Sequence, residues 1–140
     1  MSYIKYTDNI TADDYLMLRK AVGFKDLSAR QAETALKNCA FIIVAKEDEK
    51  TVGMTRLVAD GAYIAVVVDV MVLPRYQGMD IGSTMIEKTL DYIKSSIADG
   101  EQTAVYLAAA KDKEGFYERF GFVRRPDDEY GAGMSQWLSK

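Results

Sequence analysis

The feature that most constrains the fold is a long apolar run that ends in a short, glycine-bearing loop. Residues 62–73 form the run, residues 75–83 form the loop, and residues 84–97 carry a helical pattern of apolar positions. A run so rich in valine, isoleucine and alanine predicts a strand that is buried on both faces. The loop's N–H groups and the helix dipole then converge on one point. The sequence therefore predicts an α/β domain with an anion site at the start of this helix.

The loop consists of Arg75, Tyr76, Gln77, Gly78, Met79, Asp80, Ile81, Gly82 and Ser83. Gly78 and Gly82 allow a phosphate to approach the backbone closely, because they have no side chain. Asp80 is the exception, since its carboxylate lies in a loop that should bind negative charge. Aspartate tolerates left-handed backbone better than most residues, so we expect the turn to form with the Asp80 side chain in solvent or capping the helix. A carboxylate that faced the phosphates would weaken their binding.

The composition excludes several classes of function. A chain of 140 residues predicts one domain, residues 1–140, with its own core. The chain has no histidine, so neither a histidine base nor the usual zinc site is expected, and we predict no metal. The net charge of −3 argues against a nucleic-acid partner. No apolar stretch reaches the ~20 residues that span a bilayer, and the N-terminus has no signal pattern, so we expect no membrane partner. The single cysteine, Cys39, is typical of a cytoplasmic protein.

The rest of the chain alternates between strand and helix patterns. Thr11 with Asp14 and Ser28 with Gln31 resemble helix N-caps, and Asp60 followed by Gly61 predicts a hairpin. The expected helices are residues 11–23, 28–38, 84–97 and 114–119. The expected strands are residues 2–6, 40–45, 51–58, 62–73, 103–109, 122–124 and 134–138.

Two segments carry a resemblance to a known family. Residues 70–83 are similar to a motif in which a strand ending in Val-x-Pro leads into Gln/Arg-x-x-Gly-x-Gly/Ala, and residues 116–122 are similar to Phe-Tyr-x-x-x-Gly-Phe. Both motifs, in this order and with this arrangement of elements, resemble the GNAT superfamily of acetyl-CoA-dependent N-acetyltransferases. The resemblance implies a mixed, mostly antiparallel central sheet with helices on both faces. It also implies that the long strand separates from the strand at 103–109 to admit a thioester, and it allows a homodimer.

The resemblance further implies acetyl-CoA as cosubstrate and names the residues that bind it. The expected contacts are Val70, Met71, Val72, Gln77, Gly78, Met79, Asp80, Ile81, Gly82 and Ser83. The chain departs from the family pattern at three places. Asp80 stands where the family has a glycine, Ala110 stands where many members have an asparagine, and residues 103–109 contain no acidic residue.

Transfer of an acetyl group to an amine needs a deprotonated amine and a proton for the departing thiolate. By the resemblance, Tyr117 lies near the sulfur, and a phenol with a pKa near ~10 is a suitable acid for a thiolate whose conjugate acid lies near ~8.5. Without the motif, Tyr117 would be an ordinary core tyrosine between Phe116 and Phe120.

Asp69 is the candidate base, because it interrupts an apolar strand directly before Val70. Burial of this carboxylate would raise its pKa toward a useful value. Two alternatives stay open: Asp69 pairs with a nearby arginine, or the amine loses its proton to a chain of water molecules.

The favoured interpretation is an N-acetyltransferase that acts on the primary amine of a small molecule, by direct attack in a ternary complex. Acetylation of a protein N-terminus or lysine is one alternative. The other is a non-catalytic acyl-CoA sensor, which Asp80 and Ala110 favour. The acidic residues 127–129 would either face an amine or form a solvated loop.

Overall fold

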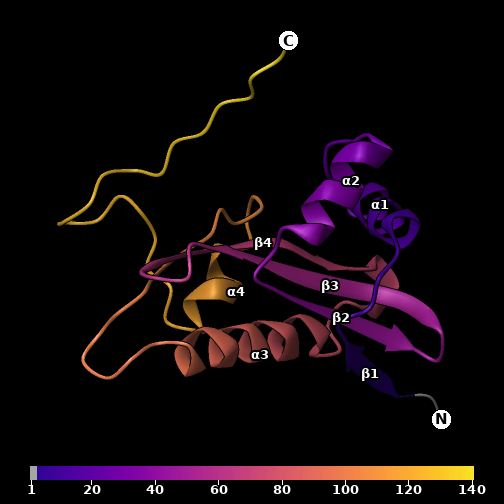
Figure 1. The fold of residues 1–140 in the computed structure, drawn as a ribbon, viewed down its shortest axis with the longest axis horizontal. Helices are drawn as coiled ribbons and strands as arrows, with labels where there is room; N and C mark the ends of the chain where they lie inside the picture. The colour runs from indigo at the N-terminus through magenta and orange to yellow at the C-terminus, as the bar shows by residue number, and fades with distance from the viewer. Residues whose placement is uncertain (1–2) are drawn as a thin grey trace. The chain divides into compact units, whose positions relative to one another are not determined.

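The computed structural model describes residues 3–140, and Figure 1 shows its elements. Their order is β1 (Ile4–Thr7), α1 (Ala12–Ala21), α2 (Ala29–Lys37), β2 (Phe41–Glu47), β3 (Lys50–Ala59), β4 (Ile64–Val72), the 3-10 helix η1 (Pro74–Tyr76), α3 (Ile81–Ser95), β5 (Ala104–Tyr106) and α4 (Glu114–Glu118). Residue contacts divide the chain into two compact units. The first ends at Leu107 and holds the sheet with α1, α2 and α3, and the second, Ala108–Lys140, holds α4. A single domain over residues 1–140 stays a prediction.

The sheet of the first unit has the strand order β1-β2-β3-β4-β5. The pairs from β1 to β4 are antiparallel, and β5 is parallel to β4. Helices α1 and α2 lie on one face of this sheet and α3 lies on the other (Figure 1). The predicted mixed, mostly antiparallel sheet with helices on both faces is therefore confirmed.

Short polar side chains determine where the helices and the hairpin begin. Thr11 Oγ1 accepts a hydrogen bond from the N–H of Asp14 at 3.1 Å, which caps α1. Ser28 and Gln31 form a reciprocal capping box at the start of α2. In the hairpin between β3 and β4, Asp60 Oδ1 accepts three backbone N–H groups, from residues 62, 63 and 64. These three starts agree with the sequence-based expectation.

The core fills both faces of the sheet with tightly packed apolar side chains. Its fully buried members include Tyr15, Leu18, Val44, Met54 and Met85. Gly53 of β3 is required by this packing, because a Cβ atom there would lie 2.8 Å from the carbonyl oxygen of Met71 in β4. The two central strands therefore approach each other more closely than a side chain at this position would allow.

Two expected strands near the C-terminus are absent. Residues 122–124 and 134–138 join no ladder in the part of the chain that the structure describes, and Met134 and Trp137 are 96% and 72% exposed. A short apolar alternation predicts a strand only if a neighbouring strand is there to pair with it. The expected strand 103–109 shortens to β5 for the same reason, since its neighbour β4 pairs with it only as far as Tyr106. The first strand begins at Ile4, and residue 2 lies outside the described range.

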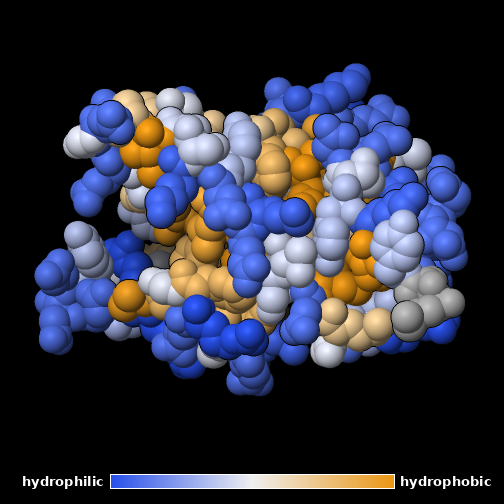
Figure 2. Space-filling model, turned by 90° about the horizontal axis from the view of Figure 1, so that it is seen from below, coloured by the Kyte–Doolittle hydropathy of each residue, from blue (hydrophilic) through white to orange (hydrophobic). Residues whose placement is uncertain are grey.

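Hydrophilic side chains cover much of the face in Figure 2, with apolar groups exposed among them. Within residues 3–140 no helix is both long enough and apolar enough to cross a membrane.

Candidate functional site

The second half of β4 has a strand on only one side. Its pairing with β5 runs from Ile64 opposite Ala104 to Val66 opposite Tyr106. Beyond that point, the described chain pairs β4 only with β3. The backbone N–H and C=O groups of Val70, Met71 and Val72, predicted to bind acetyl-CoA, lie in this stretch. An extended ligand with amide groups can bind such a free edge as an added strand.

A β-bulge lies within the same stretch. Met54 of β3 pairs with Met71 of β4, whereas Arg56 pairs with Val68, so Asp69 and Val70 together lie opposite Thr55. Asp69 has a φ of 54°, in the left-handed region. A bulge of this kind bends its strand and changes the direction of the residues that follow. The backbone of Val70–Val72 is thus aimed by the conformation of Asp69.

The loop after β4 presents backbone N–H groups at the start of α3. Within residues 3–140, no protein group accepts a hydrogen bond from the N–H groups of residues 78–80. The first N–H groups of α3 have no intrahelical partner either, because the bonds of the helix begin with Thr84 donating to the Asp80 carbonyl at 3.0 Å. Gln77 Nε2 donates to the Val72 carbonyl at 3.0 Å and so ties the loop to the end of β4. This arrangement suits a phosphate group.

Asp80 holds the left-handed position of this loop with a φ of 65°. Its side chain is exposed and makes no capping hydrogen bond with α3. The turn therefore forms with aspartate in place of glycine, as expected from the conformational tolerance of this residue. Its carboxylate adds a negative charge next to the unpartnered N–H groups, so it opposes the binding of an anion.

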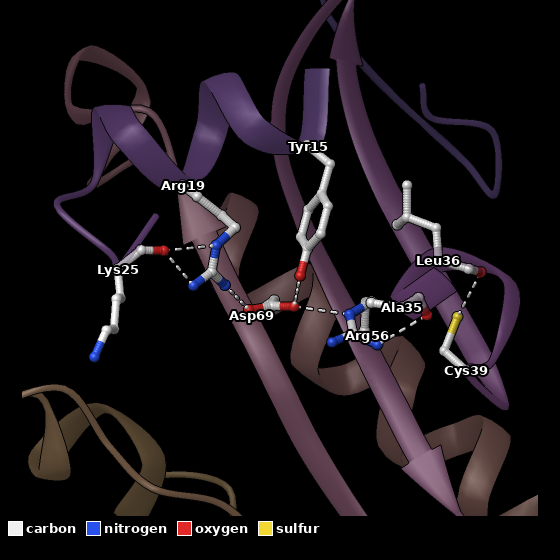
Figure 3. A network of polar contacts seen from close by, with 8 residues as sticks. All are labelled: Tyr15, Arg19, Lys25, Ala35, Leu36, Cys39, Arg56 and Asp69. Atoms are coloured by element: carbon white, nitrogen blue, oxygen red, sulfur yellow. Dashed lines mark hydrogen bonds and ion pairs between the residues drawn. The ribbon is translucent and has the colours of Figure 1, made fainter. Parts of the chain in front are cut away.

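Asp69 lies at the centre of a buried polar network (Figure 3). Oδ2 accepts hydrogen bonds from Tyr15 Oη at 2.6 Å and from Arg56 Nε at 2.7 Å, and Oδ1 accepts one from Arg19 Nη1 at 2.8 Å. The side chains of Asp69, Arg19 and Arg56 are only 8%, 11% and 12% exposed. Both carboxylate oxygens thus have donors, and two of the three donors are cationic.

The two arginines extend this network to the helices. Arg19 donates from Nε and Nη2 to the carbonyl of Lys25, between α1 and α2, at 3.2 and 2.7 Å. Arg56 Nη1 donates to the carbonyl of Ala35 in α2 at 3.2 Å. Burial disfavours the Arg56 cation, but the hydrogen bond and the charge of Asp69 outweigh that effect and raise its pKa. Burial, together with the hydrogen bond to Asp69, raises the pKa of Tyr15, so its hydroxyl remains a donor.

Of the alternatives for Asp69, these contacts favour pairing with arginine. Sequence reasoning did not find the partners, although a signal exists. An acidic residue inside an apolar strand requires a buried cation. Arg56 on the neighbouring strand and Arg19, one helical turn after Tyr15, are the buried or half-buried arginines that meet this need.

Tyr117 lies in α4 of the second unit and is 9% exposed. Its ring packs edge-on against Phe116, with ring centroids 5.0 Å apart, and against Phe122 at 6.2 Å. Burial raises the pKa of its hydroxyl, so the phenol keeps its proton at neutral pH. The predicted role of Tyr117 as an acid therefore stays a prediction, with a protonated hydroxyl available for it.

The remaining acidic candidates, residues 127–129, are exposed. Asp127 Oδ1 accepts hydrogen bonds from the N–H groups of Glu129 and Tyr130 at 2.8 and 2.7 Å, within an exposed turn. These bonds lower the pKa of Asp127. Across residues 3–140, no three acidic or cysteine side chains cluster in a way that could hold a metal ion. The segment at residues 127–129 therefore has the contacts of a solvated loop.

Comparison with known proteins independently supports the resemblance to the GNAT acetyltransferases. The sequence profile of the acetyltransferase (GNAT) domain matches residues 38–124. An uncharacterized N-acetyltransferase, ycf52, of Pyropia yezoensis is 29% identical over 133 residues, which cover 92% of this chain and 74% of that protein. A GNAT family acetyltransferase of Streptococcus pneumoniae has 30% identity and a TM-score of 0.77 and covers 100% of this chain and 99% of its own. A Staphylococcus aureus protein described as a probable acetyltransferase has 29% identity and a TM-score of 0.83, covering 97% and 100%.

Proposed function

Because the chain belongs to the GNAT family of acetyltransferases, we propose that it transfers the acetyl group of acetyl-CoA to the primary amine of a small molecule. The observation that carries this proposal is the free edge of β4, which leads directly into a loop of unpartnered N–H groups at the start of α3. A free strand edge suits the amide-containing arm of coenzyme A, and the loop suits its pyrophosphate.

The residues present fit this cosubstrate. Backbone groups of Val70, Met71 and Val72 would pair with the arm, and the amides of residues 78–83 would hold the phosphates. Gly78, with a φ of 78° and open space where a Cβ atom would stand, leaves room for the close approach. Acetyl-CoA supplies the acetyl group as an activated thioester, and the remaining tasks belong to residues of the chain.

Tyr117 is proposed to protonate the departing sulfur. Burial raises the pKa of its hydroxyl, which keeps the group in the form that can donate a proton. Proton removal from the amine has two candidate acceptors, Asp69 and a chain of water molecules. Since both oxygens of Asp69 already accept hydrogen bonds, the contacts support the water chain.

The experiment is a coenzyme A release assay across a panel of acceptors. The panel contains diamines, amino sugars and amino acids, together with peptides that carry a free N-terminus or a lysine. We expect a higher kcat/KM for at least one small amine than for any peptide. A preference for peptides would establish the protein-acetylation alternative. Tight acetyl-CoA binding without turnover on any acceptor would establish the sensor alternative and refute the proposal.

A further inference from the structure

We propose that Asp69 is a positioning residue: together with Tyr15, Arg19 and Arg56, it holds the bulge of β4 in the shape that acetyl transfer requires. This inference rests on the proposed function, because it concerns the strand edge that would bind acetyl-CoA. It differs from the sequence-based expectation, in which Asp69 removes the proton from the amine.

The first argument is the backbone of Asp69. Asp69 has a φ of 54° in the middle of an otherwise extended strand. Aspartate tolerates this left-handed conformation better than most L-residues, but the conformation still costs free energy that the surroundings must offset. The surroundings in this case are the three donors on its carboxylate, which come from α1 and β3. Without the carboxylate, two largely buried arginines would lose their counter-charge and repel each other.

The second argument is the reach of the network. Arg19 holds the Lys25 carbonyl between α1 and α2, and Arg56 holds the Ala35 carbonyl in α2. One carboxylate thereby joins β3, β4 and both helices that cover this face of the sheet (Figure 3). We therefore expect the loss of a hydrogen bond at any residue of this network to alter the conformation of the bulge.

The third argument is the location of the bulge. Asp69 directly precedes Val70–Val72, in the half of β4 that has no partner on its β5 side. On that side no strand fixes the direction of these backbone groups, so it depends on the bulge and on the pairing of Met71 and Val72 with β3. Displacement of about 1 Å in the positioning of reacting groups can cost about 100-fold in rate.

The experiment compares four variants with the parent protein and a matched control. Asp69→Asn removes the charge. Asp69→Gly keeps a residue that accepts the left-handed backbone but removes the network. Tyr15→Phe and Arg56→Lys each weaken one contact to Asp69. Asp91→Asn makes the same chemical change at an exposed position of α3 and serves as the control.

We expect Asp69→Asn and Asp69→Gly to lower kcat by about 100-fold, with a smaller change in the Kd for acetyl-CoA. Tyr15→Phe and Arg56→Lys should show the same pattern in weaker form, and Asp91→Asn should match the parent. The acidic limb of the pH profile of kcat/KM should keep its apparent pKa in Asp69→Asn. Loss of that limb would identify Asp69 as the base and overturn the inference. Full activity of Asp69→Gly would also overturn it, because the backbone alone would then suffice.

Amide hydrogen exchange separates this inference from the proposed function. We expect exchange at residues 70–72 to be faster in Asp69→Asn and Arg56→Lys than in the control, without any substrate present. If the parent protein turns over no amine, the transferase proposal fails, while exchange still decides whether the network holds β4. Unchanged exchange in both variants would overturn the positioning role.

Discussion

Replacement of Asp80 by glycine should tighten the binding of acetyl-CoA without stabilising the fold. Asp80 combines two costs in one residue, a left-handed backbone with a φ of 65° and a carboxylate beside the N–H groups that would hold the pyrophosphate. Glycine removes both costs at once. The backbone effect changes the free energy of unfolding, whereas the charge effect changes the Kd for acetyl-CoA, so separate measurements distinguish them.

The backbone effect is close to neutral for stability. Left-handed backbone costs an L-residue about 1 kcal/mol, and aspartate somewhat less than most. Glycine avoids that cost, but it loses about 0.5–1 kcal/mol through the greater freedom of the unfolded chain. The free energy of unfolding should therefore change by less than ~0.5 kcal/mol, which urea denaturation can measure.

The charge effect should appear in the affinity for acetyl-CoA. Two unit charges about 4 Å apart in water interact by about 1 kcal/mol, and a tenfold change in Kd corresponds to about 1.4 kcal/mol. We therefore expect Asp80→Gly to lower the Kd about fivefold in calorimetric titrations at low salt.

Asp80→Asn is the matched control, because asparagine also tolerates the left-handed backbone but carries no charge. It should give most of the same gain in affinity. The gain should shrink toward zero in 1 M salt, where screening extends over only about 3 Å. If both variants bind acetyl-CoA as the parent does at low salt, the loop does not hold the pyrophosphate beside Asp80, and the proposed phosphate site at residues 78–83 is refuted.

Three further predictions concern other parts of the molecule. Tyr117→Phe should lower kcat by about 100-fold and leave the Kd for acetyl-CoA unchanged, as measured by coenzyme A release and calorimetry; unchanged turnover would remove Tyr117 from the mechanism. Burial raises the pKa of Tyr15 and Tyr117 above the value near ~10 of an exposed tyrosine, so the folded protein keeps protons that the unfolded chain loses. The contribution of these two tyrosines to stability should be complete below about pH 10 and should decline as the pH rises through their pKa values in the folded protein. Urea unfolding midpoints measured between about pH 8 and pH 11 will test this. Midpoints that stay constant over this range would contradict it. Gly53→Ala should destabilise the fold by about 1–3 kcal/mol, since its Cβ atom would meet the Met71 carbonyl at 2.8 Å, and an unchanged thermal midpoint would contradict the close strand approach.

Local signals in the sequence were sufficient for the helix starts and the loop. Thr11, Ser28 and Asp60 act on groups within four residues of themselves, so their roles are readable from spacing alone. The loop at residues 77–83 is local in the same way, and its binding of a phosphate stays a prediction. The family and the fold class, which depend on the order of such elements, were therefore predicted correctly.

The partners of Asp69 could not be read in the same way. Arg19 lies 50 residues away along the chain and Arg56 lies 13 residues away, and only the packing of α1 and β3 against β4 brings them together. The sequence predicts that burial of the Asp69 carboxylate is energetically unfavourable, but it does not reveal which groups pair with this carboxylate. The end of β5 at Tyr106 is equally non-local, because it depends on where β4 leaves its neighbour.

The network around Asp69 also has a consequence for how this protein can change. The four side chains belong to one network of hydrogen bonds and ion pairs. Substitutions at Tyr15, Arg19, Arg56 and Asp69 will therefore not have additive effects on the free energy of unfolding. Once one member is lost, the loss of a second should cost less than it would in the intact protein. Variation at these four positions is therefore expected to occur jointly among functional homologues, and engineering of this face will need to exchange them as a set.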